Sequence, residues 1–175
     1  MQISLSSEKS STTNRKHMKT PNANAVFEQM PAKDVRAMVE RMIAAELWEK
    51  AEEVAQKYLS KAGKEDQNNW DRGNIIHHAH QLLGRIALAQ GNLELAKAEL
   101  LEAGKTKGSP QLSSFGPNML LAKKLLEAGE QETVLSYLKL VGEFWNNPMA
   151  NQMREGWIVE IKKGKLPDFK GNLIY

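Results

Sequence analysis

The amino-acid sequence predicts an all-α protein, and its composition, its hydrophobic spacing and its glycine positions all favour this fold class. Ala, Leu, Glu and Lys make up 73 of the 175 residues, whereas the β-branched Val, Ile and Thr make up only 20. Unbranched side chains lose little rotamer freedom in a helix, and β-branched side chains lose more. We therefore expect about seven helices that end at glycines.

Four helices are expected in the first half of the ordered chain. The first begins near Pro31, because proline is tolerated in the first helical turn. The second ends at Gly63, the third spans about residues 74–90, and Gly91 with Asn92 forms a tight turn before the fourth. The residues with helical spacing in these four segments are Val35, Met38, Val39, Met42 and Ile43; Trp48, Ala51, Ala55, Tyr58 and Leu59; Ile75, Ala79, Leu82, Leu83 and Ile86; and Leu93, Ala96, Leu100 and Ala103.

Three further helices follow a loop over residues 106–118. Pro117 is expected to open the fifth, Gly129 to end it, and Pro148 to open the seventh. Their apolar faces are Leu121, Leu125 and Ala128; Val134, Leu135, Leu138, Val141 and Trp145; and Met153, Trp157 and Ile161. Short turns between consecutive helices make the neighbours antiparallel, so we expect helix hairpins that stack on one another.

The chain divides into three regions. Residues 1–30 are expected to be a disordered basic tail, because they are rich in Ser, Thr, Asn and Lys and poor in apolar side chains. Met18 is an alternative start of the natural chain, in which case the residues before it are an added leader. Residues 31–163 form the helical domain. Residues 164–175 contain Gly and Pro and are expected to be irregular, packed on the last helices or serving as a partner-binding segment.

Charge and composition exclude several classes of protein. Residues 1–20 carry a net charge of +3, which equals the net charge of the whole chain, so residues 21–175 are neutral overall. A neutral body argues against nucleic-acid binding. The absence of Cys excludes disulfide scaffolds and thiol nucleophiles. The sequence contains no secretory signal and no apolar stretch long enough for a membrane span, so we expect a cytoplasmic protein.

Residues 80–110 resemble a tetratricopeptide repeat. Leu83 with Gly84 matches the Leu-Gly pair of that family, Gly91 matches its turn glycine, and Ala96 matches the alanine at the helix crossing. His80 and Ala87 stand where the family has Trp and Tyr. The helix-crossing positions Ala51, Ala96 and Val134 are separated by 45 and 38 residues, whereas the family repeats every 34 residues. Residues 108–130 also resemble those of uncharacterised bacterial helical-repeat proteins. The resemblance implies a short, right-handed superhelix like that of tetratricopeptide-repeat (TPR) proteins.

In this family the first helix of each hairpin lines the concave face. The resemblance therefore places His78, Gln81 and Arg85 on that face, followed by Met119 and Lys123 from the next repeat. Arg85 and Lys123 occupy the same repeat position, so stacking would place two cations side by side. Such a pair would suit an acidic or carboxylate-bearing partner. Glu40 at the matching position of the first hairpin weakens this expectation.

Two other features have a functional and a structural interpretation. His77 and His80 share a helix face, whereas His78 points elsewhere. Asp71 or a Glu could supply a third ligand, but no spacing demands a metal site, so we expect no metal or cofactor. Residues 109–118 carry no charge and contain Phe115 and Asn118. This segment is either a binding loop or a connection in which Phe115 fills the core and Asn118 or Ser114 caps the next helix.

These observations favour a non-catalytic protein-interaction module that is a monomer or a weak homodimer. The sequence contains no G-x-S-x-G, P-loop or G-x-G-x-x-G motif, so we do not expect an enzyme. An immunity or antitoxin-like protein that inhibits a partner is the alternative, and a His-centred metal protein is a weaker one. The residues expected to bind the partner are His78, Gln81, Arg85, Phe115, Asn118, Met119 and Lys123.

Overall fold

The all-α prediction is confirmed by a computed structural model, which describes residues 23–64 and 69–174. These residues contain nine α-helices, seven of them with at least seven residues, one short 3₁₀ helix and no strand. In chain order the helices are α1 (Ala23–Glu28), α2 (Ala32–Ala44), α3 (Trp48–Lys64), α4 (Arg72–Ala89), α5 (Leu93–Gly104), α6 (Pro110–Phe115), α7 (Leu120–Glu127), α8 (Gln131–Val141), α9 (Pro148–Lys162) and the 3₁₀ helix η1 (Lys170–Leu173).

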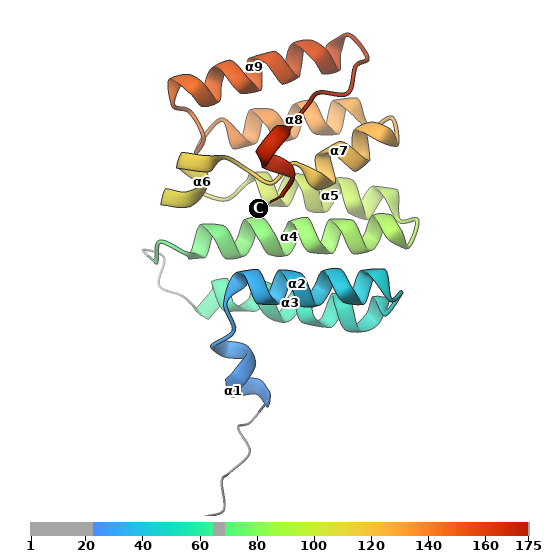
Figure 1. The fold of residues 1–175 in the computed structure, drawn as a ribbon, viewed down its shortest axis with the longest axis vertical. Helices are drawn as coiled ribbons and strands as arrows, with labels where there is room; N and C mark the ends of the chain where they lie inside the picture. Colours follow the sequence, from blue (N-terminus) through green and yellow to red (C-terminus); the bar gives the residue numbers. More distant parts are fainter. Residues whose placement is uncertain (1–22, 65–68, 175) are drawn as a thin grey trace, which may run out of the picture.

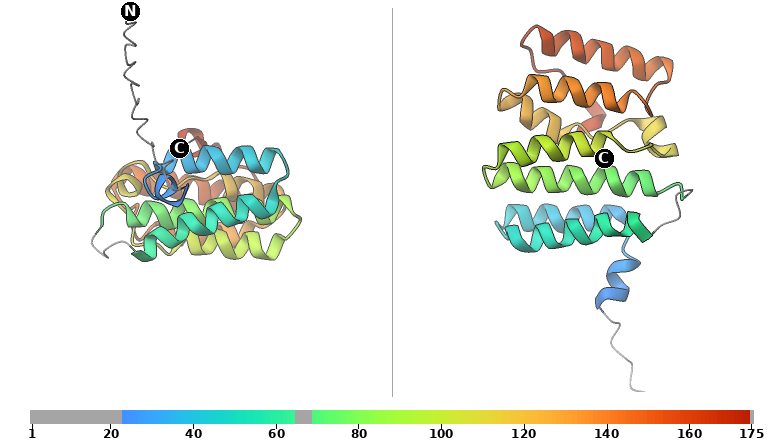
Figure 2. Two further views of the ribbon diagram at one scale, coloured as in Figure 1. Left: turned by 90° about the horizontal axis from the view of Figure 1, so that it is seen from below. Right: turned by 180° about the vertical axis from the view of Figure 1, so that it is seen from behind.

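The long helices stack one above another along the longest axis of the molecule, from α2 and α3 near one end to α9 at the other (Figure 1). Neighbours along the chain pack together, with the closest association between α4 and α5. The two further views show α2, α7 and η1 on one face and α3, α5 and α8 on the other (Figure 2). None of the described helices combines the length and hydrophobicity needed to cross a membrane.

The turns between helices follow from their local sequences. Gly91 and Gly129 adopt positive φ angles of 78° and 90°, as expected for glycines that end helices. Asn92 caps α5 as expected, because its side chain accepts a hydrogen bond from the Leu95 N–H at 3.1 Å. Gly63, in contrast, lies within α3, which continues to Lys64, so the expected cap at this position is wrong.

Two short helices lie in segments that were expected to be irregular. Residues 23–28 form α1, which differs from a tail disordered over residues 1–30; the structure describes nothing of residues 1–22. Phe27 of α1 is buried, and the Lys61 ammonium donates to its carbonyl oxygen at 2.9 Å. The second short helix is α6, which is capped by Ser109, whose hydroxyl accepts from the Leu112 N–H. The fifth expected helix, α7, therefore begins at Leu120 and not at Pro117.

The end of the chain turns back over the second half of the molecule. Phe169 is fully buried and meets Trp157 edge to face, with ring centroids 5.0 Å apart. Asn172 is also buried, and its side-chain amide donates to the carbonyl oxygens of Phe115 and Pro117 at 3.0 and 2.9 Å. The Met119 N–H completes this attachment by donating to the Asn172 carbonyl at 2.7 Å. These bonds hold η1 against the segment that precedes α7.

Candidate functional site

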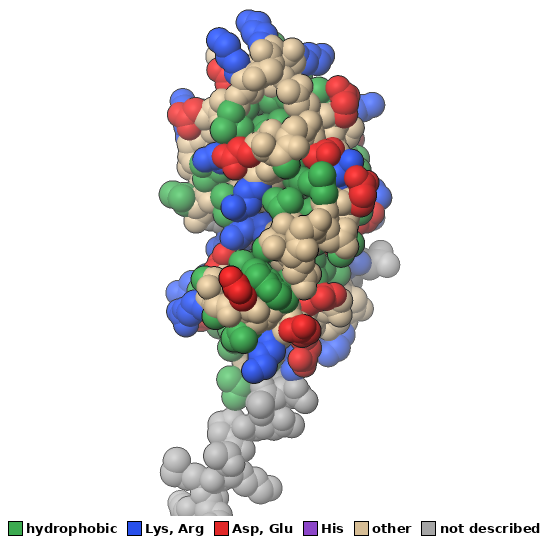
Figure 3. All heavy atoms as spheres, turned by 90° about the vertical axis from the view of Figure 1, so that its right-hand side faces the viewer, with side chains coloured by type: hydrophobic (Ala, Val, Ile, Leu, Met, Phe, Trp, Pro, Cys, Tyr) green, Lys and Arg blue, Asp and Glu red, His purple; other side chains and the backbone are tan. Residues whose placement is uncertain are grey.

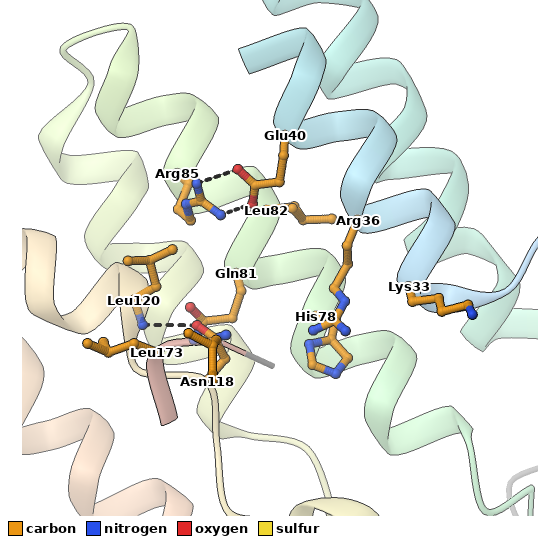
Figure 4. Close-up of a pocket in the computed structure, with 11 residues that line it drawn as sticks. Lys33, Arg36, Glu40, His78, Gln81, Leu82, Arg85, Asn118, Leu120 and Leu173 are labelled. Atoms are coloured by element: carbon orange, nitrogen blue, oxygen red, sulfur yellow. Dashed lines mark hydrogen bonds and ion pairs between the residues drawn. The ribbon is translucent and has the colours of Figure 1, made fainter. Parts of the chain in front are cut away.

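A pocket of about 200 Å³ lies where α2, α4, the start of α7 and the end of the chain meet (Figure 4). Four of the residues expected to bind a partner line this pocket: His78, Gln81 and Arg85 come from α4, and Asn118 comes from the segment before α7. The residues that line the pocket are Lys33, Arg36 and Glu40 from α2; His78, Gln81, Leu82 and Arg85 from α4; and Asn118, Leu120, Leu173 and Ile174. The pocket lies on the face of the molecule that carries α2, α7 and η1.

Positive charge exceeds negative charge in this lining. Three of its side chains are cationic and one, Glu40, is a carboxylate. Arg85 donates hydrogen bonds from two guanidinium nitrogens to the Glu40 carboxylate, and its Nη2 lies 2.6 Å from Oε2. Lys33 and Arg36 project from α2 (Figure 4), and neither forms an ion pair with any residue that the structure describes. The positive charge still available to a ligand therefore comes from α2.

This arrangement differs from the pair of cations expected on the concave face. Arg85 pairs with Glu40 across two helices, and burial lowers the pKa of the Arg85 guanidinium. Lys123 does not line the pocket and lies 3.9 Å from Glu127 on its own helix. The charged neighbour of Arg85 is thus a carboxylate from α2. Arg85 and Lys123 therefore do not line this pocket together.

A chain of hydrogen bonds lies beneath the pocket. The Gln81 side-chain amide donates from Nε2 to the Tyr137 hydroxyl at 3.1 Å, and that hydroxyl donates to the Asn118 carbonyl at 3.3 Å. Gln81 is only 4% exposed, and its carbonyl oxygen Oε1 has no hydrogen-bond partner. The Nε of Arg85 is likewise buried without a partner. Unpartnered buried polar atoms are uncommon in native proteins, so each needs an explanation.

We expect Tyr137→Phe to lower the free energy of unfolding by about 1–3 kcal/mol, because it leaves the Gln81 amide buried without an acceptor. Tyr58→Phe is a matched control, since Tyr58 is equally buried but its hydroxyl has no hydrogen-bond partner. Removing that hydroxyl should leave stability unchanged or raise it. Urea unfolding of both variants measures the difference, and equal losses of stability would contradict the hydrogen-bond chain described above.

The three neighbouring histidines of α4 face different surroundings. His77 is fully buried; its Nδ1 lies 3.1 Å from the Ala103 carbonyl, and the Asn118 N–H donates to its Nε2 at 3.1 Å. His77 is therefore neutral with the proton on Nδ1. His80 Nδ1 lies 2.7 Å from Glu99. His78 lines the pocket, and burial lowers its pKa well below the usual value. Within the described ranges, no group of three or more metal-ligating side chains could hold a metal ion.

The remaining predicted residues take separate positions. Phe115 is 66% exposed, and Leu112 is the side chain of α6 that fills the core, so the interpretation in which Phe115 is buried is wrong. Asn118 lines the pocket, and its side-chain oxygen accepts from the Leu120 N–H at 2.9 Å. Met119 is fully buried and offers no surface to a partner.

The pocket contains residues that the sequence reasoning did not select. Lys33 and Arg36 share the polar side of α2 with Glu40 at helical spacing, so a search for charges opposite the apolar face would have found them. Leu173 and Ile174 could not be found in this way. They reach the pocket because Asn172 attaches the end of the chain to the segment before α7.

Comparison with models of known families, with curated proteins and with solved structures found no match to this chain. No family or repeat is identified in this way. What is established is a stack of helices packed against their neighbours in sequence, with a positively charged pocket on one face.

Proposed function

We propose that this chain is a non-catalytic protein-interaction module built as a short TPR-like stack of three hairpins. The hairpins are α2 with α3, α4 with α5, and α7 with α8. Support comes from the packing of these neighbours and from the close contact at Gly84, where an added Cβ would meet Leu121, Glu99 and Ala96. Small residues at helix crossings allow hairpins to pack closely, and a stack then buries the apolar face that each hairpin exposes alone.

The proposed docking site is the pocket between α2 and α4, and the proposed partner carries acidic side chains. The observation that carries this proposal is the pair of cations on α2, Lys33 and Arg36, which have no ion-pair partner in residues 23–64 and 69–174. Leu173 and Ile174 also line the site, whose volume of about 200 Å³ leaves space for a single side chain or a small group. Interfaces often place one anchor side chain in such a pocket.

Other surfaces carry a more balanced charge. The side of the molecule drawn in Figure 3 shows Lys and Arg side chains interspersed with Asp and Glu, with apolar side chains between them. Ion pairs such as Lys97 with Glu94 and Lys105 with Glu102 neutralise cations on α5 and at its C-terminal end. An acidic partner should therefore prefer the α2 cations to these paired lysines.

The proposal predicts that Arg36→Glu abolishes binding to acidic peptides. A random dodecapeptide library displayed on phage would be selected on immobilised protein. We expect peptides rich in Asp and Glu to be enriched on the wild type and on Lys139→Glu, and lost from Arg36→Glu. Lys139 is an exposed lysine of α8, so its reversal makes the same change in net charge away from the pocket. Enrichment without acidic residues, or equal enrichment on all three proteins, would contradict the proposal.

A second candidate function, the inhibition of a partner through an edge of the molecule, is favoured by exposed aromatic side chains. Trp70 before α4 and Phe115 at the end of α6 are 65% and 66% exposed. Large exposed apolar side chains mark interaction surfaces when they form a patch. The same selection separates the two functions. Peptides that still bind the Arg36→Glu variant but no longer bind a Phe115→Ser variant would locate the interface at α6.

A further inference from the structure

Three buried side-chain polar atoms of the described residues have no hydrogen-bond partner, and two of them, on Gln81 and Arg85, belong to residues of the pocket; the third is the Tyr58 hydroxyl. Gln81 Oε1 can only accept a hydrogen bond, and Arg85 Nε can only donate one. Both residues come from α4 and line the pocket, and Figure 4 shows Gln81 ending beside Asn118 while Arg85 reaches Glu40. A pocket that presents an unused acceptor together with unpaired cations matches a ligand that combines a hydrogen-bond donor with an anionic group.

The orientation of the Gln81 amide is fixed by its neighbours. The Tyr137 hydroxyl has a single hydrogen, and this hydrogen points to the Asn118 carbonyl at 3.3 Å. The hydroxyl oxygen therefore accepts from Gln81, which must present its Nε2 to Tyr137. The other amide atom, Oε1, is left as an acceptor without a partner.

The charged groups of the pocket complement both ends of a zwitterion. Lys33 and Arg36 can hold a carboxylate, and Arg can do so with two parallel hydrogen bonds. Glu40 retains acceptor capacity beyond its two bonds to Arg85, because a carboxylate offers about four lone-pair sites. An ammonium group would thus find both Glu40 and the Gln81 Oε1 as acceptors.

The apolar part of the lining suits a branched aliphatic side chain. Leu82 of α4, Leu120 of α7 and Leu173 of η1 supply this part, and Asn172 fixes η1 through its two bonds to carbonyl oxygens. The cavity of about 200 Å³ is smaller than the usual 300–1,000 Å³ of a site for a drug-sized ligand. Its size therefore favours a molecule comparable to a single amino acid.

We propose that the pocket binds a free aliphatic α-amino acid, with its carboxylate at Lys33 and Arg36 and its ammonium at Gln81 and Glu40. This inference goes beyond the protein-interaction function, because it requires no protein partner. A bound amino acid would compete with an acidic side chain for the same cations, and it would thereby regulate partner binding. Failure of the amino-acid experiment would leave the peptide selection unaffected, so the two proposals fail separately.

Isothermal titration calorimetry with L-leucine on the full chain tests this proposal. We expect 1:1 binding, at least tenfold weaker binding of leucinamide, which lacks the carboxylate, and at least tenfold weaker binding of 4-methylpentanoate, which lacks the ammonium. Arg36→Gln should weaken L-leucine binding at least tenfold. Arg41→Gln should not, because Arg41 is an exposed arginine of α2 outside the pocket lining.

A Gln81→Leu variant tests the contribution of the unpartnered acceptor. It should weaken L-leucine binding but leave the much weaker binding of 4-methylpentanoate unchanged, provided that its circular dichroism spectrum matches that of the wild type. If Gln81→Leu does not fold, the comparison of L-leucine binding by Arg36→Gln and by Arg41→Gln still tests the proposal. Absence of L-leucine binding to the wild type, equal binding of 4-methylpentanoate, or an unchanged affinity in Arg36→Gln would overturn the proposal.

Discussion

Replacing Gly84 with leucine is expected to lower the free energy of unfolding by roughly 3 kcal/mol, at the upper end of the usual cost of overpacking a core. Gly84 lies in α4 at its crossing with α5. A Cβ at this position would overlap the side chain of Leu121 and would lie 3.1 Å from the Glu99 Cβ and 3.3 Å from the Ala96 carbonyl oxygen. Leucine would have to force α5 and α7 away from α4.

Gly156→Ala is the matched control for this substitution. Gly156 lies inside α9, and a Cβ there would meet no atom within 4 Å. Alanine should therefore stabilise the protein by about 0.5–1 kcal/mol, because it is the better helix former. Urea unfolding measures both changes, and an unchanged midpoint for Gly84→Leu would mean that α4 and α5 do not cross closely at this position.

Acidification below neutral pH is expected to destabilise the protein through the buried His77. Burial lowers the pKa of His77 to about 4, from a usual value of 6.5. Between these two pH values the unfolded chain binds a proton that the folded chain does not, so stability falls as the pH falls through this window. One histidine with this difference contributes roughly 3 kcal/mol, which is fully present above pH 6.5 and lost by about pH 4.

A His77→Gln variant isolates this effect from the titration of carboxylates. The pKa of His78 is also lowered by burial, so some dependence on pH in the same direction should remain in the variant. We expect the unfolding free energy of the wild type to fall more steeply between pH 6.5 and 4.5 than that of His77→Gln. Parallel curves for the two proteins would contradict a buried, neutral His77 in the folded state.

The long helices could be predicted from the sequence because their signals are local. The apolar spacing of Val35, Val39 and Ile43 and the turn at Gly91 depend only on neighbouring residues. The short helix α6 was missed because its sequence, with Ser109, Pro110 and two further serines, reads as a loop. It forms because Ser109 caps it and Leu112 is buried against distant helices, which the local sequence does not reveal.

The candidate site could be predicted only in part. The resemblance to a tetratricopeptide repeat predicted His78, Gln81 and Arg85 as partner-binding residues, and these three line one pocket. The partner of Arg85 is Glu40, which lies 45 residues earlier in the chain, and Leu173 enters through a tail held by Asn172. Both depend on how distant elements pack, so no local pattern could identify them.

The central claim of this account is that a ligand enters the pocket between α2 and α4. ¹H–¹⁵N NMR of the labelled protein, titrated with the most enriched acidic peptide from the selection, tests it most directly. We predict that the Arg85 Nε–H and the Gln81 side-chain amide shift on saturation, because a ligand in the pocket would contact both groups. Binding that shifts other signals, such as those of the Trp70 indole, and leaves these two unchanged would contradict the claim.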